Sequence, residues 1–123
     1  MFRSDGAFSG FAVDDLEAAR SFYADTLGLR VETLENGFLT LHLTSGGSVL
    51  VYGKEQHDPA GFTILNFPVD DVAAAVDDLA SRGVEMLRYD GVDHNERGIV
   101  RGMGPDIAWF TDPAGNVLAV LEG

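Results

Sequence analysis

The 123-residue sequence contains no cysteine, and this absence excludes several classes of site. Without thiols the chain can form no disulfide, no thiolate nucleophile and no Cys-ligated zinc or iron–sulfur centre. It also lacks any apolar run near the roughly 20 residues that a membrane-spanning helix needs. Its first residues lack the apolar core of a secretory signal. We therefore expect a soluble, cytoplasmic protein that has no membrane partner.

Basic residues are also scarce. Eight Lys and Arg stand against 20 Asp and Glu, and the formal net charge is -12. A negatively charged surface repels the phosphate backbone of nucleic acids, so we expect no nucleic-acid partner. The charge either attracts a cationic ligand or only keeps the protein soluble. The second interpretation is favoured because many of the acids stand at predicted helix starts and turns, where they have local roles.

The sequence does contain an internal repeat. Residues 11–19 and 67–75 agree at six of nine positions, with an offset of 56 residues. Later in each copy, residues 49–51 resemble residues 117–119 at an offset of 68. The second copy therefore holds about a dozen extra residues, and the Gly-rich stretch 91–104 is the obvious place for them. Such a repeat predicts two copies of one supersecondary unit that share a core.

Each copy is predicted to be a strand, a helix and three further strands. In the first copy Asp14 is expected to cap the helix, Glu17 completes a capping box, and Gly28 ends the helix. In the second copy Asp70 or Asp71 is expected to cap the helix. The predicted strands cover residues 7–13, 29–34, 37–44 and 48–53, then 62–68, 84–90, 105–111 and 116–121.

The whole chain, residues 1–123, is assigned to a single domain made of two repeats, at about 7–54 and 61–122.

Two motifs carry a resemblance to a known family. They read Val13-x-Asp15 with Phe22-Tyr23-x-x-Thr26-Leu27-Gly28-Leu29, and Trp109-Phe110-x-Asp112-Pro113-x-Gly115-Asn116. Over nearly its whole length the chain resembles the vicinal oxygen chelate superfamily. That superfamily includes glyoxalase I, extradiol dioxygenases, fosfomycin-resistance enzymes and bleomycin-resistance proteins. The resemblance implies an α+β fold in which two tandem βαβββ units form a curled mixed sheet round an open cleft.

The resemblance also implies a divalent metal in the cleft, held by the first and last strands of each unit. The positions of this sequence that match the metal ligands are Phe8, Val51, Ile64 and Ala119. None of these side chains can bind a metal, which needs His, carboxylate or thiolate ligands here. We therefore expect no metal and no other cofactor. The matching branch is that of the metal-free bleomycin-resistance proteins, which sequester a ligand without chemistry and are dimeric.

Strand alternation and the long loop 89–105 select six residues for ligand binding. They are Phe8, Phe38, His42, Asn66, Arg101 and Trp109. An apolar cleft floor is expected from Val49, Val51, Val117 and Ala119. A metal cluster at residues 93–96 is disfavoured, because neighbours on one loop seldom converge on one ion.

Each polar candidate has an alternative role. His42 is either a half-exposed strand residue or a ligand contact, and a metal-binding role is least favoured. Trp109 is either core or a stacking platform, and Asn66 either pins the backbone or contacts ligand. Arg101 either lies on the surface or points inward to hold an anionic or carbonyl group.

We predict a metal-free small-molecule-binding protein of the glyoxalase/bleomycin-resistance type, which sequesters a small, partly aromatic ligand and is linked to antibiotic resistance. The alternative is a glyoxalase-family lyase, isomerase or dioxygenase. It would use atypical metal ligands such as His42 with a loop carboxylate, or His42 as a metal-free general base with Arg101 stabilising charge. Whether the protein is an enzyme stays open. A homodimer is expected because open strand edges need cover.

Overall fold

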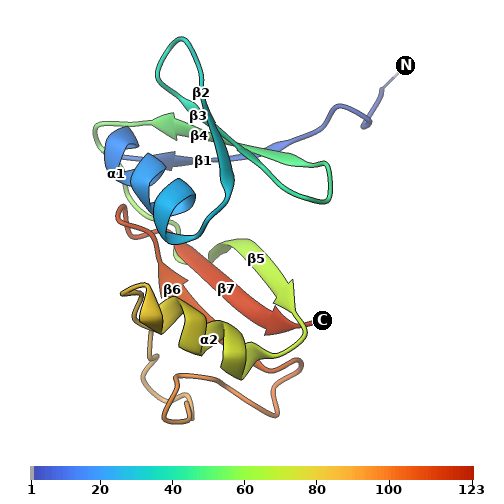
Figure 1. Cartoon of the computed structure of the whole chain (residues 1–123), viewed down its shortest axis with the longest axis vertical. Coiled ribbons are helices and arrows are strands. Elements are labelled where there is room, and N and C mark those ends of the chain that lie inside the picture. Colours follow the sequence, from blue (N-terminus) through green and yellow to red (C-terminus); the bar gives the residue numbers. More distant parts are fainter. Residues whose placement is uncertain (1) are drawn as a thin grey trace. The chain divides into compact units, whose positions relative to one another are not determined.

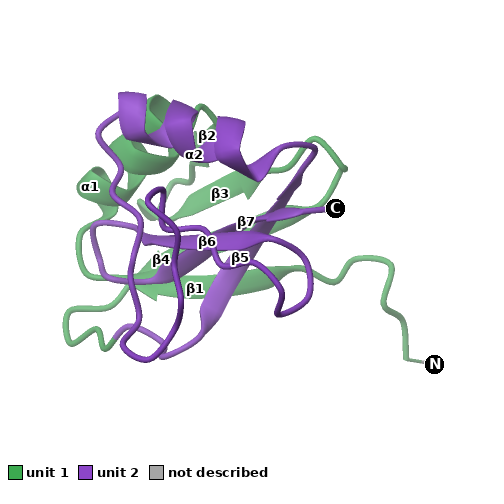
Figure 2. Ribbon diagram, turned by 90° about the horizontal axis from the view of Figure 1, so that it is seen from below, with its two compact units in different colours: residues 1–58 green, residues 59–123 purple. Residues whose placement is uncertain are grey.

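The computed structural model describes residues 2–123 and divides the chain into two compact units, Met1–Asp58 and Pro59–Gly123 (Figure 2). The boundary falls between the two predicted repeats. Both units combine a helix with a mixed sheet, which confirms the predicted α+β class. No helix within the described residues is long and apolar enough to cross a membrane.

The first unit places one helical segment beside a four-stranded sheet of order β1-β4-β3-β2 (Figure 1). β1 is parallel to β4, and the other neighbours are antiparallel. The elements are β1 (Ser9–Val13), α1 (Leu16–Arg20), the π-helical turn η1 (Ser21–Thr26), β2 (Arg30–Thr33), β3 (Leu39–His42) and β4 (Ser48–Gly53).

The α1 helix begins one residue later than predicted. The Oδ1 atom of Asp15 accepts a hydrogen bond from the backbone N–H of Ala18 at 3.1 Å, so Asp15 rather than Asp14 is the N-cap. Helical structure continues through η1 to Gly28, whose φ of 74° favours glycine. Within η1, the buried Tyr23 packs its ring 5.7 Å from that of Phe11 on β1.

The core face of the first sheet includes two residues that were predicted to line the cleft. Val49 and Val51 are buried, and Val51 pairs with the buried Leu39 on β3 and Phe11 on β1. The cleft-floor prediction is therefore wrong for both valines. The cause is a repeat offset that is one residue too short. Because Phe67, the counterpart of Phe11, pairs with Val120, the true offset at this strand is 69 residues, and Leu50 takes the position assigned to Val51.

The second unit has a three-stranded sheet of order β5-β7-β6, with α2 lying across one face (Figure 1). β5 is parallel to β7, and β6 is antiparallel to it. The Asp71 carboxylate accepts from the Ala74 N–H at 3.1 Å, so Asp71 is the N-cap. The elements are β5 (Thr63–Val69), α2 (Val72–Ser81), β6 (Ile107–Thr111) and β7 (Val117–Glu122).

The predicted strand 84–90 does not form. The segment lies beside β6 but makes a single ladder bond, from the Leu87 N–H to the Trp109 carbonyl at 2.7 Å. This pairing is the repeat equivalent of Glu32 with Thr40 in the first unit. The ladder stops there because Val100 occupies the next part of the β6 edge through two hydrogen bonds to Ile107, of 2.8 and 3.1 Å. Two segments thus share an edge that one strand was predicted to fill.

The hairpin between β6 and β7 holds the buried polar pair of the second unit. The Asp112 carboxylate accepts from the backbone N–H groups of Ala114 and Asn116, at 3.0 and 2.8 Å, and from the Asn116 side-chain amide at 3.1 Å. Burial of both side chains is tolerated because each polar group has a partner. The Asp-Pro-x-Gly-Asn motif therefore fixes a turn.

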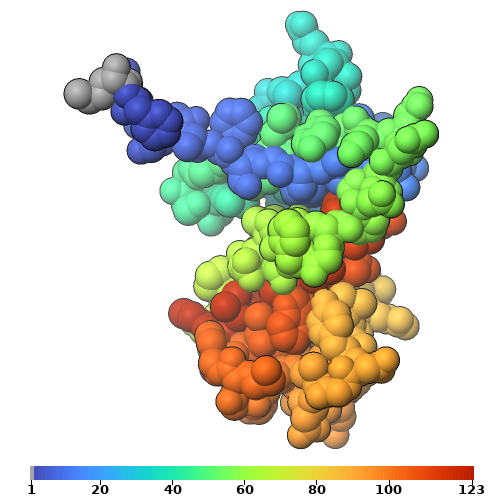
Figure 3. All heavy atoms as spheres, turned by 180° about the vertical axis from the view of Figure 1, so that it is seen from behind, coloured from blue at the N-terminus to red at the C-terminus, as the bar shows by residue number. Residues whose placement is uncertain are grey.

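At the opposite end of the chain, residues 2–8 are exposed and project from the first unit as the dark-blue spheres of Figure 3.

Candidate ligand-binding faces

Each sheet has a core face, which meets the helix of its own unit, and an opposite face, which we call its outer face. Successive side chains of a strand point to opposite faces, so the residues of each outer face follow from the register. The first outer face comprises Gly10, Ala12, Phe38, Thr40, His42, Leu50 and Tyr52. The second comprises Asn66, Ile107, Trp109, Thr111, Val117 and Ala119.

The second outer face brings two predicted ligand-binding residues into one row. Ala119 on the central strand pairs with Asn66 on one side and Trp109 on the other. Because neighbouring strands lie about 4.8 Å apart, the backbones of Asn66 and Trp109 are roughly 10 Å apart, with Ala119 between them. Asn66 is exposed and Trp109 is half-buried. Ala119 between them is fully buried, so the row presents an amide and an indole on either side of a buried methyl group.

Two aromatic residues that sequence reasoning did not select lie against Trp109. The Tyr89 ring is 5.4 Å from the indole at 77°, and the His94 ring is 6.3 Å away at 74°. Both are edge-on contacts of the favourable kind. Tyr89 lies within the predicted strand 84–90, whereas nothing in the sequence pattern indicates that the loop brings His94 to this face.

His94 is fixed by its own loop. Its Nε2 atom accepts from the Tyr89 backbone N–H at 2.9 Å, and its Nδ1 atom contacts the Gly98 carbonyl at 2.8 Å. A backbone N–H can only donate and a carbonyl can only accept, so the ring is neutral with the proton on Nδ1. Both nitrogens are thereby occupied, and His94 shapes the wall around Trp109 rather than acting as a base or metal ligand.

On the first outer face Phe38 directly precedes β3 and His42 is its last residue, about 13 Å further along the chain direction. The Phe38 ring lies 6.3 Å from that of Tyr52. The Nε2 atom of His42 lies 2.9 Å from the Oε1 atom of Glu32 on β2, and the His42 side chain is 31% exposed. Because a carboxylate only accepts, Nε2 carries the proton in this contact, and in a neutral ring the lone pair is on Nδ1.

The two remaining candidates, Phe8 and Arg101, are exposed, and for Arg101 this agrees with the surface alternative. Phe8 precedes β1 and is 65% exposed. Arg101 forms an ion pair with Asp106, with 3.5 Å between its Nη1 atom and Oδ2, and its side chain is 59% exposed. Asp106 thus offsets the positive charge that was expected to attract an anionic group.

The residues present do not fit the divalent metal that the fold implies. Of the four matching positions, Phe8, Ile64 and Ala119 carry no ligating atom, and Leu50, which replaces Val51, carries none either. Within residues 2–123 no three His, Asp or Glu side chains lie close enough together to hold an ion. The donor set suits an apolar ligand better than a metal.

Comparison with known proteins fits this architecture. A family model for the Glyoxalase/Bleomycin resistance protein/Dioxygenase superfamily matches residues 8–120. The chain belongs to this superfamily. A search of curated proteins found no match.

Solved structures of the glyoxalase type share the fold over nearly the whole chain. TnmS3, an antibiotic binding protein from Streptomyces sp. CB03234, has 24% identity and a TM-score of 0.66, with 98% of both chains covered. UcmS2 has 18% identity and a TM-score of 0.74, covering 99% of this chain and 100% of its own. A glyoxalase family protein from Enterococcus faecalis has 19% identity and a TM-score of 0.66, with the same coverage.

Proposed function

We propose that this glyoxalase-superfamily protein binds a small, partly aromatic molecule at the second outer face and sequesters it without chemical change. The observation that supports this proposal most directly is the row of Asn66, Ala119 and Trp109, in which Tyr89 and His94 pack against Trp109. Small-molecule sites are mostly apolar and aromatic with a few placed polar groups, and this face has that composition. The four positions that match the metal ligands of the family hold only apolar side chains, which supports ligand binding over metal-dependent catalysis.

The charge of the molecule favours cationic or neutral ligands. Arg101 is offset by Asp106, so the overall charge of -12 is not countered locally by that arginine. An antibiotic binding protein with the same fold supports a role in antibiotic sequestration. As part of the same proposal we place the protein in the cytoplasm, where a sequestered compound would be kept from its target.

Fluorescence titration tests this proposal, because Trp109 is the single tryptophan. The ligands are matched planar aromatic compounds carrying an ammonium, a hydroxymethyl or a carboxylate group. We expect the cationic and neutral compounds to change Trp109 emission, and added salt to weaken the cationic one by screening. Asn66→Ala should weaken binding about threefold to tenfold, the usual loss for one hydrogen bond. Gln56→Ala, which removes an exposed amide in the other unit, should leave binding unchanged.

Two results would contradict the proposal. Compounds that raise the melting temperature without changing Trp109 emission would place the site elsewhere. A preference for the carboxylate that Arg101→Ala abolishes would show that Arg101 rather than the net charge selects the ligand.

A second candidate function rests on the Glu32–His42 contact of 2.9 Å. A carboxylate that accepts from Nε2–H orients the ring and leaves the lone pair on Nδ1, which is the arrangement of a general base. The expected activity is removal of a proton next to a carbonyl, read as deuterium exchange into a ketone or aldehyde. His42→Gln should abolish the exchange and Glu32→Gln should slow it about tenfold or more, while the Trp109 titration stays unchanged in both variants. If exchange is absent from the unaltered protein, this candidate is wrong.

A further inference from the structure

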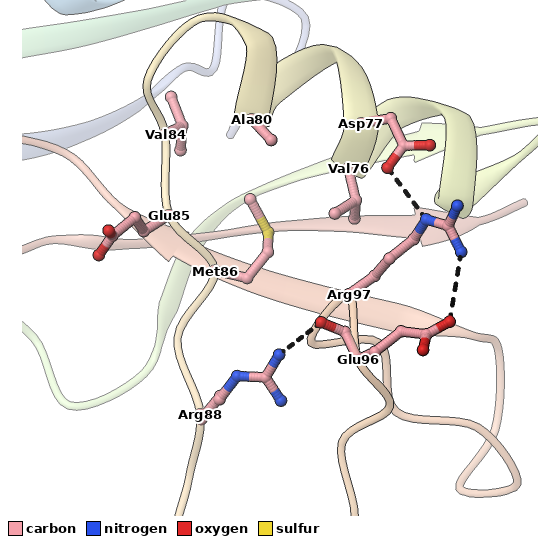
Figure 4. A pocket seen from close by; sticks show the side chains of 9 residues that line it. All are labelled: Val76, Asp77, Ala80, Val84, Glu85, Met86, Arg88, Glu96 and Arg97. Carbon is pink, nitrogen blue, oxygen red and sulfur yellow. Dashed lines mark hydrogen bonds and ion pairs between the residues drawn. The ribbon is translucent and has the colours of Figure 1, made fainter.

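A concave site lies on the helix side of the second unit, opposite the outer face. It is a pocket of about 530 Å³ between α2 and the segments 84–88 and 96–97 (Figure 4). Pockets that hold small molecules span about 300 to 1,000 Å³, so the size is adequate. None of the residues selected from the sequence lines it.

One wall of the pocket is apolar. Val76 and Ala80 are separated by one turn of α2 and therefore share a helix face. Val84 and Met86 alternate along the facing segment and point toward the same space (Figure 4). Gly98 permits this position of Met86, because a Cβ atom at residue 98 would come within 2.8 Å of the Met86 Cβ. The wall can cover a short aliphatic chain.

The rest of the lining is charged and consists of two arginines, Arg88 and Arg97, which have different partners, and three carboxylates, those of Asp77, Glu85 and Glu96. The Nε atom of Arg97 donates to Asp77 at 2.9 Å, and Glu96 lies 4.0 Å from its Nη1 atom. The hydrogen bond to Asp77 raises the pKa of the Arg97 guanidinium, which is thus a charge with a counterion. Arg88 instead donates to the backbone carbonyls of Asn95 and Glu96, at 2.9 and 2.8 Å. Across residues 2–123 no carboxylate forms an ion pair with Arg88.

We infer that this pocket binds an amphipathic carboxylate, with its aliphatic chain on the wall of Val76, Ala80, Val84 and Met86 and its carboxylate at Arg88. The two carbonyl contacts hold the Arg88 guanidinium in place, so its remaining N–H donors are pre-oriented for an anion. The molecule as a whole repels anions, so the site selects a carboxylate only through this arginine and the apolar contact together.

The test compares octanoate, octanol and octylamine by isothermal titration calorimetry with the full chain. We expect octanoate to bind at least about tenfold more tightly than octanol, as a charge-assisted hydrogen bond would give, and octylamine to bind more weakly than either. Arg88→Gln should reduce octanoate to the affinity of octanol, and Arg88→Lys should keep part of the preference. Arg82→Gln is the matched control, because Arg82 pairs with Asp78 outside this pocket.

A further variant locates the ligand without touching an arginine. Ala80→Leu fills the apolar wall and should abolish binding of both octanoate and octanol. Circular dichroism is read first, to show that each variant is folded. Trp109→Phe should leave octanoate binding intact, which separates this site from the outer face. The inference is overturned if octylamine binds as well as octanoate, if Arg88→Gln keeps the preference, or if folded Ala80→Leu still binds.

Discussion

Two adjacent aspartates precede each helix, and the second of each pair caps it. The Asp71 carboxylate accepts the Ala74 N–H, and Asp15 repeats the contact at α1. Sequence reasoning chose Asp14 for α1 because Glu17 stands three residues later, as in a capping box. Neighbouring aspartates have the same propensity, so only the backbone can decide between them. Both caps have extended backbone, with φ near -137° and -138°, which turns the side chain back over the first turn.

The cap assignment predicts a difference between two neighbouring substitutions. Asp71→Ala should lower the free energy of unfolding by about 1 kcal/mol, because the N–H of Ala74 loses its acceptor. Asp70→Ala removes the same charge from an exposed position and should change it by less than about 0.5 kcal/mol. Urea titrations of both variants measure the difference. Equal losses would mean that the charge, and not the cap, stabilises α2.

At the scale of elements, the hydrophobic pattern predicted both helices and seven of the strands to within a few residues. The failures have specific causes. A register error of one residue moves every side chain of a strand to the other face, and this placed Val49 and Val51 wrongly. Residues 84–90 have the alternation of a strand, but strand formation also depends on a free edge. Val100 occupies part of the β6 edge, and alternation gives no sign of that competitor.

The approach of Gly98 to Met86 leads to a prediction about the segment that replaces the missing strand. Gly98→Ala should destabilise the protein by about 2–4 kcal/mol, because it forces a φ of 88° on alanine and brings a methyl group within 2.8 Å of Met86. Gly91→Ala has a similar φ of 77° but open space around the added methyl, so it should cost about 1–2 kcal/mol. Thermal and urea unfolding measure both.

The comparison separates backbone strain from crowding. If the two alanine variants lose the same stability, the close contact with Met86 adds nothing to the cost of Gly98→Ala. The packing of segment 84–88 against residue 98 would then not be what holds this segment beside α2.

At the scale of the whole molecule, the candidate site was only partly predictable. Alternation correctly assigned Thr40 and His42 to the face opposite the buried leucines, and it put Asn66 and Trp109 on one face of the second sheet. The partners of these residues were missed. Glu32 on β2 contacts His42 diagonally on the neighbouring strand β3, and a long loop brings His94 into contact with Trp109. Such contacts depend on strand register and on the path of a loop, and neither leaves a periodic hydrophobic pattern in the sequence.

Because apolar side chains occupy the positions that match the metal ligands of the family, we predict that the protein carries no stoichiometric divalent ion. Protein purified without chelator should contain less than about 0.1 equivalent of zinc, nickel, manganese or iron by elemental analysis. EDTA should leave the melting temperature unchanged, because a bound ion would stabilise the native state by mass action. One equivalent of metal that EDTA removes, with a fall in melting temperature, would instead favour an enzyme with atypical ligands.

The sheet edges argue for a homodimer. β1 and β2 end the first sheet, and β5 ends the second, so each presents a row of backbone groups without a neighbouring strand in its own sheet. Such edges promote association unless they are covered. Phe62 lies directly before β5 and is 69% exposed, which adds apolar surface next to one edge. We predict a two-fold symmetric dimer that buries this side chain.

Light scattering after size exclusion, at micromolar concentration, measures the mass. The unaltered protein should have twice the chain mass of 13.2 kDa. Phe62→Ser should raise the dissociation constant about tenfold or more, since burying a phenylalanine contributes about 1.5–3 kcal/mol. Met103→Ser is the control, because Met103 is 76% exposed on the loop before β6 and should leave the dimer intact. A monomer mass for the unaltered chain would show that the edges are covered within one molecule, and equal weakening by both substitutions would move the interface toward the loop around Met103.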